Sequence, residues 1–434
     1  MNNLETSLPK NWSVRFFTIF TGQAFSLFGS SLVQFALIWY LTKETGSATV
    51  LATASLFAML PQILLGPIAG TVVDRGNRRI IMILSDASIA VSTLLLAYLF
   101  WSNIVEIWHI YAILAIRSAG GAFHYPAMAA STTLMVPKEQ LSRVAGANQT
   151  LQGLVGIVAP PVGALLVEAL SNENILMIDV VTAIIGITPL LFFSVPQPQK
   201  AKAHESTPKA SFMQDFAAGF KYIVAWPGLL LLALMATLLN FLIAPTSALT
   251  PLLVTKYFNL GALELGSLDS LFGVGMIAGG VTLGLWGGFK KKIVTSLTGI
   301  ALFSFAILAI AAAPADKFWI MLVSMSVFGF LMPLVNGPIH ALFQSVVEPE
   351  MQGRVLSLVG SVAQAMMPLS LIVAGPVTDA TSYQAWFWVA GILNLAIALA
   401  GFFIPALMNI ESNHANATLK TSPDSPTVEQ TLIQ

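Results

Sequence analysis

Three charged side chains interrupt long apolar stretches of this sequence. Arg117, Asp86 and Asp179 each stand among Leu, Ile, Val and Ala residues, and His124 follows Arg117 in the same stretch. A charge in an apolar environment is costly unless it is paired or hydrated, so such residues are usually functional. A histidine can also exchange a proton near neutral pH. These residue types indicate ion pairing or proton transfer inside an apolar scaffold.

The sequence lacks the patterns of common catalytic and metal sites. It has no cysteine, and its 5 histidines show neither metal-binding spacing nor a Ser-His-Asp arrangement. The glycine-rich stretch 273–280 lies in an apolar run with no preceding strand, which argues against a nucleotide site. The 20 basic and 20 acidic residues balance, so no basic field attracts nucleic acid. We predict a protein that is not an enzyme and that binds no metal, nucleotide, nucleic acid or other cofactor.

The composition indicates that the scaffold lies in a membrane. Of the 434 residues, 56% are hydrophobic and 9% are charged, whereas a soluble domain carries about 25% charged residues. A helix needs about 20 mostly apolar residues to cross a bilayer. We predict an all-α integral membrane protein with twelve transmembrane helices, over residues 16–41, 48–73, 80–101, 107–130, 143–168, 174–195, 229–252, 265–289, 293–313, 318–341, 354–377 and 386–408.

The distribution of basic residues predicts the orientation. Lys and Arg favour the cytoplasmic loops of membrane proteins. With both termini in the cytoplasm, the cytoplasmic segments hold 16 of the 20 Lys and Arg residues, and the opposite loops hold Lys43, Lys256 and Lys317. We therefore expect a multi-pass protein whose termini are both cytoplasmic.

One long polar segment divides the spans into two sets of six. Residues 196–228 begin with a Pro- and Lys-rich stretch and end with phenylalanines at helical spacing. This pattern predicts a cytoplasmic linker with an amphipathic helix on the membrane surface. We expect an N-terminal six-helix bundle at 1–195, a C-terminal six-helix bundle at 229–409 and a polar cytoplasmic tail at 410–434.

The two halves share a sequence pattern. Residues 136–144 read VPKEQLSRV and residues 347–355 read VEPEMQGRV, and both fit V-x-x-E-x-x-x-R-V after the fourth span of their half. Two parallel six-helix repeats are the arrangement of transporters that bind their substrate near the middle of the membrane, between the repeats. The repeat therefore favours a transporter.

Three stretches resemble motifs of the major facilitator superfamily. Gly70-TVVDRGNRR is similar to its signature in the loop after span two, Arg117-SAGGAFHYPA to its span-four arginine motif, and Gly156-IVAPPVGA to the span-five motif of its antiporters. GQAFSL at 22–27 and LTKETGSATVL at 41–51 resemble bacterial macrolide-efflux proteins of the drug:proton antiporter group.

The resemblance implies the major facilitator fold and alternating-access export of hydrophobic drugs, with macrolides as the leading substrate, in exchange for protons. It further implies a monomer in a bacterial cytoplasmic membrane, driven by the proton motive force and working beside a separate ATP-binding resistance protein. Two alternatives stay open. One is an exporter or flippase of an endogenous amphiphile such as a siderophore or a lipid, and the other is a membrane receptor or scaffold that transports nothing.

The resembled loop motif implies a conformational latch. A carboxylate at an exposed helix N-terminus contributes roughly 0.3–1 kcal/mol, and span eleven begins near Arg354 on the same side of the membrane. We expect Asp74 to cap that helix when the cytoplasmic side is closed, while anchoring to the cytoplasmic face is the alternative role of the arginines. The latch residues are Gly70, Asp74, Arg75, Arg78 and Arg79.

Arg117 and Asp179 lie at similar predicted depths in the first bundle. Both follow the outer end of a span that runs toward the cytoplasm, and their depths differ by about 6 Å at 1.5 Å per residue. We predict that they pair, either as a permanent structural ion pair or as one that breaks when Asp179 takes up a proton. Asp86 in the third span is a further candidate for the proton site.

The span-five motif has two possible roles. Its residues are Gly156, Pro160, Pro161 and Gly163. The resemblance implies a role in antiport, and close packing between spans is the alternative.

In the superfamily fold, spans one, four, seven and ten line the cavity. A few polar groups among many apolar ones would suit a small hydrophobic or amphipathic substrate. The cavity candidates are Gln23, Ser26, Gln34, His124, Asn240, Met332, Asn336, His340 and Gln344.

Overall fold

The computed structural model describes residues 12–197 and 212–411. Within these ranges the chain is helical and contains no strand. The helices are α1 (Trp12–Thr45), α2 (Ala48–Arg75), α3 (Arg78–Trp101), α4 (Ile107–Met135), η1 (Lys138–Gln140), α5 (Leu141–Ala169), α6 (Asn172–Phe192), α7 (Phe212–Ala225), α8 (Pro227–Leu252), η2 (Leu253–Tyr257), α9 (Ala262–Trp286), α10 (Lys292–Ala312), α11 (Phe318–Val346), α12 (Pro349–Ala380), α13 (Ala385–Phe403) and α14 (Pro405–Met408).

In the described part of the chain, eleven helices are long and apolar enough to cross a membrane. The twelfth predicted span corresponds to α4, whose hydropathy is lower because it carries His109, Arg117 and His124. With 29 residues α4 still exceeds the length that crosses about 30 Å of hydrocarbon. It packs against α2 and α3, and the Arg117 side chain is only 9% exposed.

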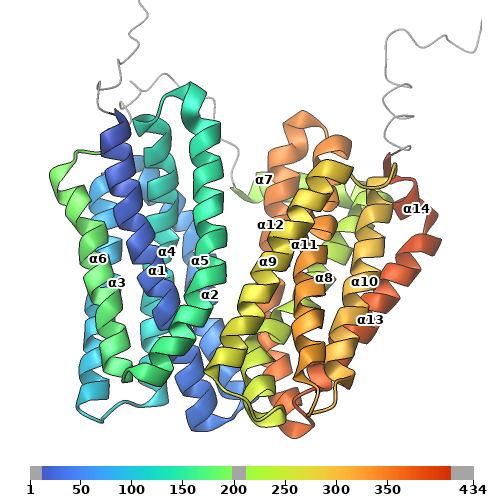
Figure 1. The fold of residues 1–434 in the computed structure, drawn as a ribbon. Helices are drawn as coiled ribbons and strands as arrows, with labels where there is room; N and C mark the ends of the chain where they lie inside the picture. The colour runs from blue at the N-terminus through green and yellow to red at the C-terminus, as the bar shows by residue number, and fades with distance from the viewer. Residues whose placement is uncertain (1–11, 198–211, 412–434) are drawn as a thin grey trace, which may run out of the picture.

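The helices form two bundles that stand side by side (Figure 1). The first consists of α1–α6 and the second of α8–α13. We call the end of the molecule with α7, α14 and the start of α1 the terminal face, and the opposite end the distal face (Figure 1). This arrangement is the predicted pair of six-helix bundles.

Local sequence sets where several of these helices begin and end. Asn77 stands where the resembled loop motif usually has glycine, and its side chain accepts a hydrogen bond from the N–H of Ile80 at the start of α3. Gly287 ends α9 in a left-handed conformation, with φ of +76°. The last predicted span, 386–408, is interrupted after Phe403, because Pro405 cannot continue the hydrogen-bond pattern and begins the short α14 instead.

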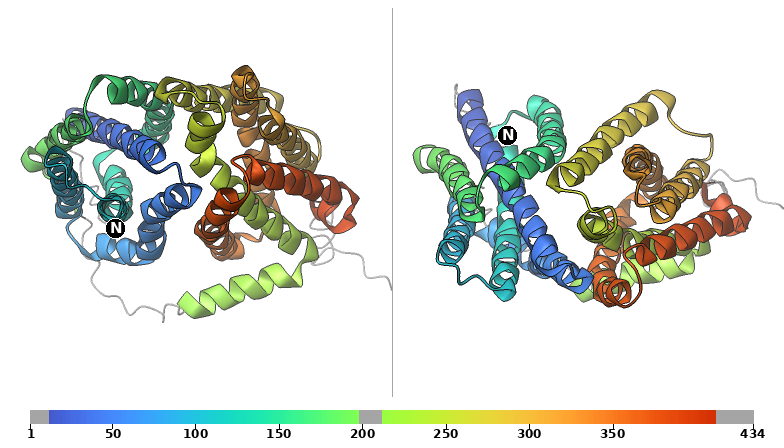
Figure 2. Two further views of the ribbon diagram at one scale, coloured as in Figure 1. Left: turned by 90° about the horizontal axis from the view of Figure 1, so that it is seen from below. Right: turned by 60° about the horizontal axis from the view of Figure 1, so that its bottom comes forward.

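Helix α7 lies within the predicted linker and runs along the outside of the second bundle (Figure 2). Phe220 and Val224 are 57% and 46% exposed, while Gly219 approaches the backbone of Arg354 on α12. The helix therefore attaches by one side and presents apolar side chains on another. The linker residues 198–211 and the tail from 412 onward lie outside the described residues.

The two bundles contact each other near the distal face. A Cβ atom at Gly266 of α9 would lie 2.9 Å from the carbonyl oxygen of Pro160 on α5. A Cβ atom at Gly375 of α12 would lie 2.9 Å from the Cα atom of Thr49 on α2. These backbones approach too closely for larger side chains, so the distal ends of four helices close the space between the bundles.

The bundles are apart at the terminal face. A Cβ atom at Gly70 of α2, at Gly146 of α5 or at Gly353 of α12 would meet no atom within 4 Å. Figure 1 shows the bundles converging from the terminal face toward the distal face. The structure is therefore open at the terminal face and closed at the distal face.

Candidate functional site

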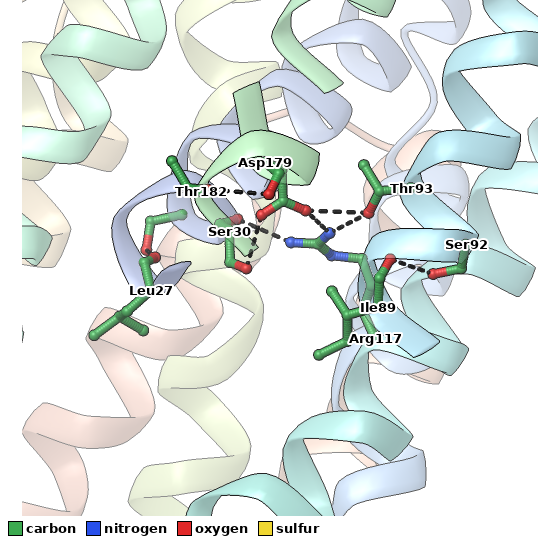
Figure 3. A network of polar contacts seen from close by, with 9 residues as sticks. Leu27, Ser30, Ile89, Ser92, Thr93, Arg117, Asp179 and Thr182 are labelled. Carbon is green, nitrogen blue, oxygen red and sulfur yellow. Dashed lines mark hydrogen bonds and ion pairs between the residues drawn. The ribbon is translucent and has the colours of Figure 1, made fainter. Parts of the chain in front are cut away.

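Arg117 and Asp179 form the ion pair that the sequence predicts (Figure 3). One guanidinium nitrogen of Arg117 bonds to Oδ2 of Asp179 and donates to Oγ1 of Thr93 at 2.6 Å. The other terminal nitrogen donates to the carbonyl oxygen of Ser30 at 3.2 Å. Helices α1, α3, α4 and α6 thus meet at one point through polar side chains.

Asp179 has a full set of partners. Besides Arg117, its carboxylate accepts hydrogen bonds from the hydroxyls of Ser30 at 3.0 Å and Thr93 at 3.1 Å. The Asp179 side chain is completely buried. Such saturation favours the structural interpretation of the pair, because each lost bond would leave a buried polar group unsatisfied. Ser30 and Thr93 were not identified from the sequence as partners of this pair. Their hydroxyl groups within apolar spans could have indicated that role.

A second buried carboxylate, Asp86 of α3, has fewer partners. Nε2 of Gln23 donates to Asp86 Oδ2 at 3.0 Å and to the carbonyl oxygen of Gly186 at 3.1 Å. Nε2 of His124 lies 3.4 Å from Asp86 Oδ1 but makes no hydrogen bond. Asp86 is 5% exposed. The loosest contact of this carboxylate is therefore to a group that can itself carry a proton.

His124 connects this cluster to a cavity of about 440 Å³ between α1, α4 and α5. The wall is mostly apolar and contains Phe20, Leu27, Met128, Leu151 and Val155. Its polar groups come from three helices of the first bundle: Gln23 and Ser31 on α1, His124, Tyr125 and Thr132 on α4, and Asn148 and Gln152 on α5.

Only two of the predicted cavity residues, Gln23 and His124, line this cavity. The others lie elsewhere. Ser26 instead packs against α6, since a Cβ at Gly186 would lie 3.0 Å from its Cβ. Asn240 bonds to its own helix, through the carbonyl oxygen of Ala236 at 2.9 Å.

The remaining predicted cavity residues also lie outside it. Gln34 is exposed on α1, and Met332 of α11 packs partly buried against the apolar core. Asn336, His340 and Gln344 are exposed on α11. Because the bundles are apart at the terminal face, residues of the second bundle do not contribute to a cavity formed by the first.

Asn148 and Gln152 were not predicted from the sequence. They stand four residues apart on α5, with Gly156 one further turn along, so the three share one helix face. All three line the cavity. A polar stripe at spacing four within an apolar span was the signal that could have identified them.

The loop after α2 holds helix ends together at the terminal face. Arg78 donates to the carbonyl oxygen of Ala130 on α4 at 2.7 Å, and Arg79 donates to that of Leu191 on α6 at 2.6 Å. Asp74 and Arg75 are exposed, and within the described residues no hydrogen bond joins Asp74 to α12. The capping contact implied by the resemblance is thus absent while this face is open.

The span-five motif is distributed over three environments. Gly156 faces the cavity. Pro160 and Pro161 adjoin Gly266 of α9 at the contact between the bundles, and a Cβ at Gly163 would lie 3.0 Å from the ring of Phe35 on α1. The motif residues of α5 therefore serve both in close helix packing and in lining the cavity.

Comparison with known sequences places this chain among transporters. The family profile of the Major Facilitator Superfamily matches residues 19–257 and 229–430. Macrolide efflux protein A of Streptococcus pyogenes is 36% identical over 389 residues, which cover 90% of this chain and 95% of that protein. The multidrug efflux pump Tap of Mycolicibacterium fortuitum is 26% identical and covers 88% of this chain and 94% of its own.

Solved structures share the fold at low sequence identity. The nucleoside transporter NupG superposes with a TM-score of 0.65 at 15% identity, covering 90% of this chain and 98% of its own. A bacterial homolog of the human lysosomal transporter Spinster, in an inward-facing conformation, superposes with a TM-score of 0.65 at 13% identity and covers 96% and 100% of the two chains. The chain therefore belongs to the Major Facilitator Superfamily and is an efflux transporter of that type.

Proposed function

We propose that this protein exports hydrophobic or amphipathic drugs from the cytoplasm, with macrolide antibiotics as the leading substrate, in exchange for protons. The observation that supports the substrate class is the cavity of about 440 Å³, whose apolar wall carries a few separated polar groups. Such a surface suits an amphiphile, since it buries the apolar part of the molecule and orients the molecule by a few hydrogen bonds. The relation to macrolide efflux protein A supports the same class.

The terminal face is cytoplasmic in this proposal. The basic residues Arg75, Arg78, Arg79 and Lys290–Lys292 gather on that face, in keeping with the preference of Lys and Arg for the cytoplasmic side. The cavity then receives its cargo from the cytoplasm or the inner leaflet. Rocking of the bundles opens the distal face for release, which is alternating access.

The proton site in this proposal is the pair of Asp86 and His124. His124 faces the cavity, and its Nε2 lies 3.4 Å from the buried carboxylate of Asp86. The other ionisable groups nearby are Asp179 and Arg117, which neutralise each other in their own pair. A proton held between His124 and Asp86 can leave to the open cavity, after which cargo is bound and carried outward.

The test is uptake of radiolabelled erythromycin into inverted vesicles that contain the protein. An imposed gradient, acidic inside, should drive accumulation, and a protonophore should abolish it. Lack of uptake together with binding of a lipid or siderophore would favour the endogenous amphiphile instead. Tight binding without movement of any substrate would favour the receptor or scaffold. Light scattering of the purified protein tests whether it is a monomer. Transport measured with and without an ATP-binding resistance protein tests whether the two proteins work together.

A further inference from the structure

The closed distal face contains a carboxylate that joins the two bundles. Asp379, near the end of α12, accepts hydrogen bonds from the backbone N–H of Ala48 at 2.7 Å and of Thr49 at 2.9 Å. It also accepts one from the hydroxyl of Ser47 at 2.9 Å. These groups form the N-terminus of α2, whose first N–H groups have no partner within the helix. A side chain of the second bundle therefore caps a helix of the first.

The backbone around Asp379 is adapted to this approach. One turn earlier on α12, a Cβ at Gly375 would lie 2.9 Å from the Cα of Thr49 and 3.1 Å from the Cβ of Ala52. Glycine is therefore needed for α12 to come close enough for the next turn to reach the end of α2. The close contact at Gly375 and the capping by Asp379 therefore both require the same short distance between α12 and α2.

The same spacing of glycine and aspartate occurs at the opposite end of the helix pair. Residues 375–379 read GPVTD, and residues 70–74 read GTVVD. Asp379 is the penultimate residue of α12 and Asp74 is the penultimate residue of α2. Since α2 and α12 are antiparallel neighbours, each aspartate lies at the end where the other helix begins. At the terminal face, a Cβ atom at Gly70 or at Gly353 would meet no atom within 4 Å, so the two helices are not in close contact there.

We propose that Asp379 is a distal latch, which stabilises the state closed at the distal face and works in opposition to Asp74 at the terminal face. Closing the distal ends of α2 and α12 places Asp379 on the N-terminus of α2. Opening them exposes both to water and lets the terminal ends approach. The inference rests on the alternating access proposed above, but it depends on neither the cargo nor the proton.

The physical reason for the latch is charge complementarity at a helix end. The N-terminus of a helix carries a partial positive charge, and a carboxylate there also satisfies its unpaired N–H groups. Asp379 meets this N-terminus only when the bundles are together at the distal face. The hydrogen bonds of Asp379 therefore stabilise the distal-closed state and not the distal-open state. A free-energy difference of this kind shifts the equilibrium between two conformations.

Single-cysteine labelling in the full-length protein tests the latch, because the natural chain contains no cysteine. Ala164→Cys reports on the distal side, since Ala164 is completely buried at the α5–α9 contact. Thr132→Cys reports on the cavity that opens to the terminal face. A membrane-impermeant maleimide is applied to right-side-out vesicles for the first reporter and to inverted vesicles for the second.

Asp379→Asn should raise the labelling rate of the distal reporter about two- to thirty-fold, the ratio expected for loss of a helix cap. Labelling of the terminal reporter should fall. Asp316→Asn is the matched control, because Asp316 is an exposed carboxylate on the same face, in the α10–α11 connection. Gly375→Leu should act like Asp379→Asn, since it separates the helices without removing the charge. Equal labelling in Asp379→Asn and Asp316→Asn would overturn the latch.

A double variant distinguishes opposing latches from a general loss of structure. Asp74→Asn should lower distal labelling, and Asp74→Asn combined with Asp379→Asn should return it toward the rate of the natural chain. Increased labelling of both reporters in Asp379→Asn would mean loosening of the fold and would overturn the proposal. A distal reporter that no variant and no condition exposes would also overturn it, because there would be no opening for Asp379 to control. Export that fails with latch behaviour intact would count only against the proposed cargo or proton.

Discussion

His124 lies between the cavity and the buried carboxylate of Asp86, with its Nε2 3.4 Å from Asp86 Oδ1. The first bundle therefore contains two carboxylates in different situations. Asp179 is saturated by Arg117, Thr93 and Ser30, whereas Asp86 has one firm side-chain donor, Gln23. A saturated carboxylate holds helices together, and one with a spare position beside a histidine is suited to bind a proton.

We expect Asp86→Asn to uncouple export from the proton gradient. Asparagine fills the same space and can accept from Gln23, but it cannot take up a proton. Concentrative uptake of erythromycin in inverted vesicles should be lost, while exchange of labelled for unlabelled drug should continue. His124→Gln should weaken coupling less, because the carboxylate remains. Uphill accumulation by Asp86→Asn at the rate of the matched Asp316→Asn variant would contradict this role.

The Arg117–Asp179 pair should behave as a structural unit. Removing one partner of a buried pair leaves an unpaired charge and costs about 3–5 kcal/mol, while an apolar replacement of both costs much less. Arg117→Met and Asp179→Leu should each lower the free energy of unfolding in detergent by about that amount. The double variant should be less destabilised than the sum, and chemical denaturation measures all three.

Strict additivity of the two losses would argue against direct coupling between Arg117 and Asp179. A transport assay separates the two interpretations of this pair. If the pair is structural, a double variant that folds should still respond to a proton gradient. If Asp179 carries the proton, the double variant should exchange drug without responding to the gradient.

Much of this architecture follows from local sequence. A charge within an apolar span must find a partner, so Arg117 and Asp179 could be paired from their depths alone. That prediction succeeds because the cost of an unsatisfied group arises within one bundle. The end of α13 before Pro405 also has a local cause, the missing N–H of proline, but the predicted span 386–408 ran past it.

The relation between the bundles could not be predicted in the same way. Whether Asn336 and His340 line a shared cavity depends on which face is closed, and no residue pattern within one span specifies that state. Asp379 was missed because an aspartate at the end of a span looks like an ordinary hydrated residue. Only the position of the other bundle reveals that it caps α2.

Gln152 should determine which cargo is bound. It shares a cavity-facing stripe on α5 with Asn148 and Gly156. Gln152→Leu should weaken export of a macrolide that hydrogen-bonds there by about two- to ten-fold in KM, as expected for one hydrogen bond. Gln149→Leu is the matched control, because Gln149 lies three residues before Gln152 on α5, is exposed and does not line the cavity. Equal shifts in both variants would mean that the cavity face does not select the drug.

The contact between α9 and α11 should depend on single glycines. A Cβ at Gly279 would overlap the carbonyl oxygen of Phe330 on α11, whereas a Cβ at the neighbouring Gly280 would meet nothing within 4 Å. Gly279→Ala should destabilise the protein by about 1–3 kcal/mol through overpacking. Gly280→Ala should be neutral or raise stability by about 0.4–1 kcal/mol, because alanine restricts the unfolded chain.

Thermal and chemical unfolding of the two alanine variants in detergent give this comparison directly. Both substitutions add one methyl group to the same helix, so a difference between them arises from the approach of α11 and not from helix propensity. Equal stability would mean that α9 and α11 can move apart without cost. In that case the second bundle could not rock as a rigid body, and export would require its helices to slide past one another.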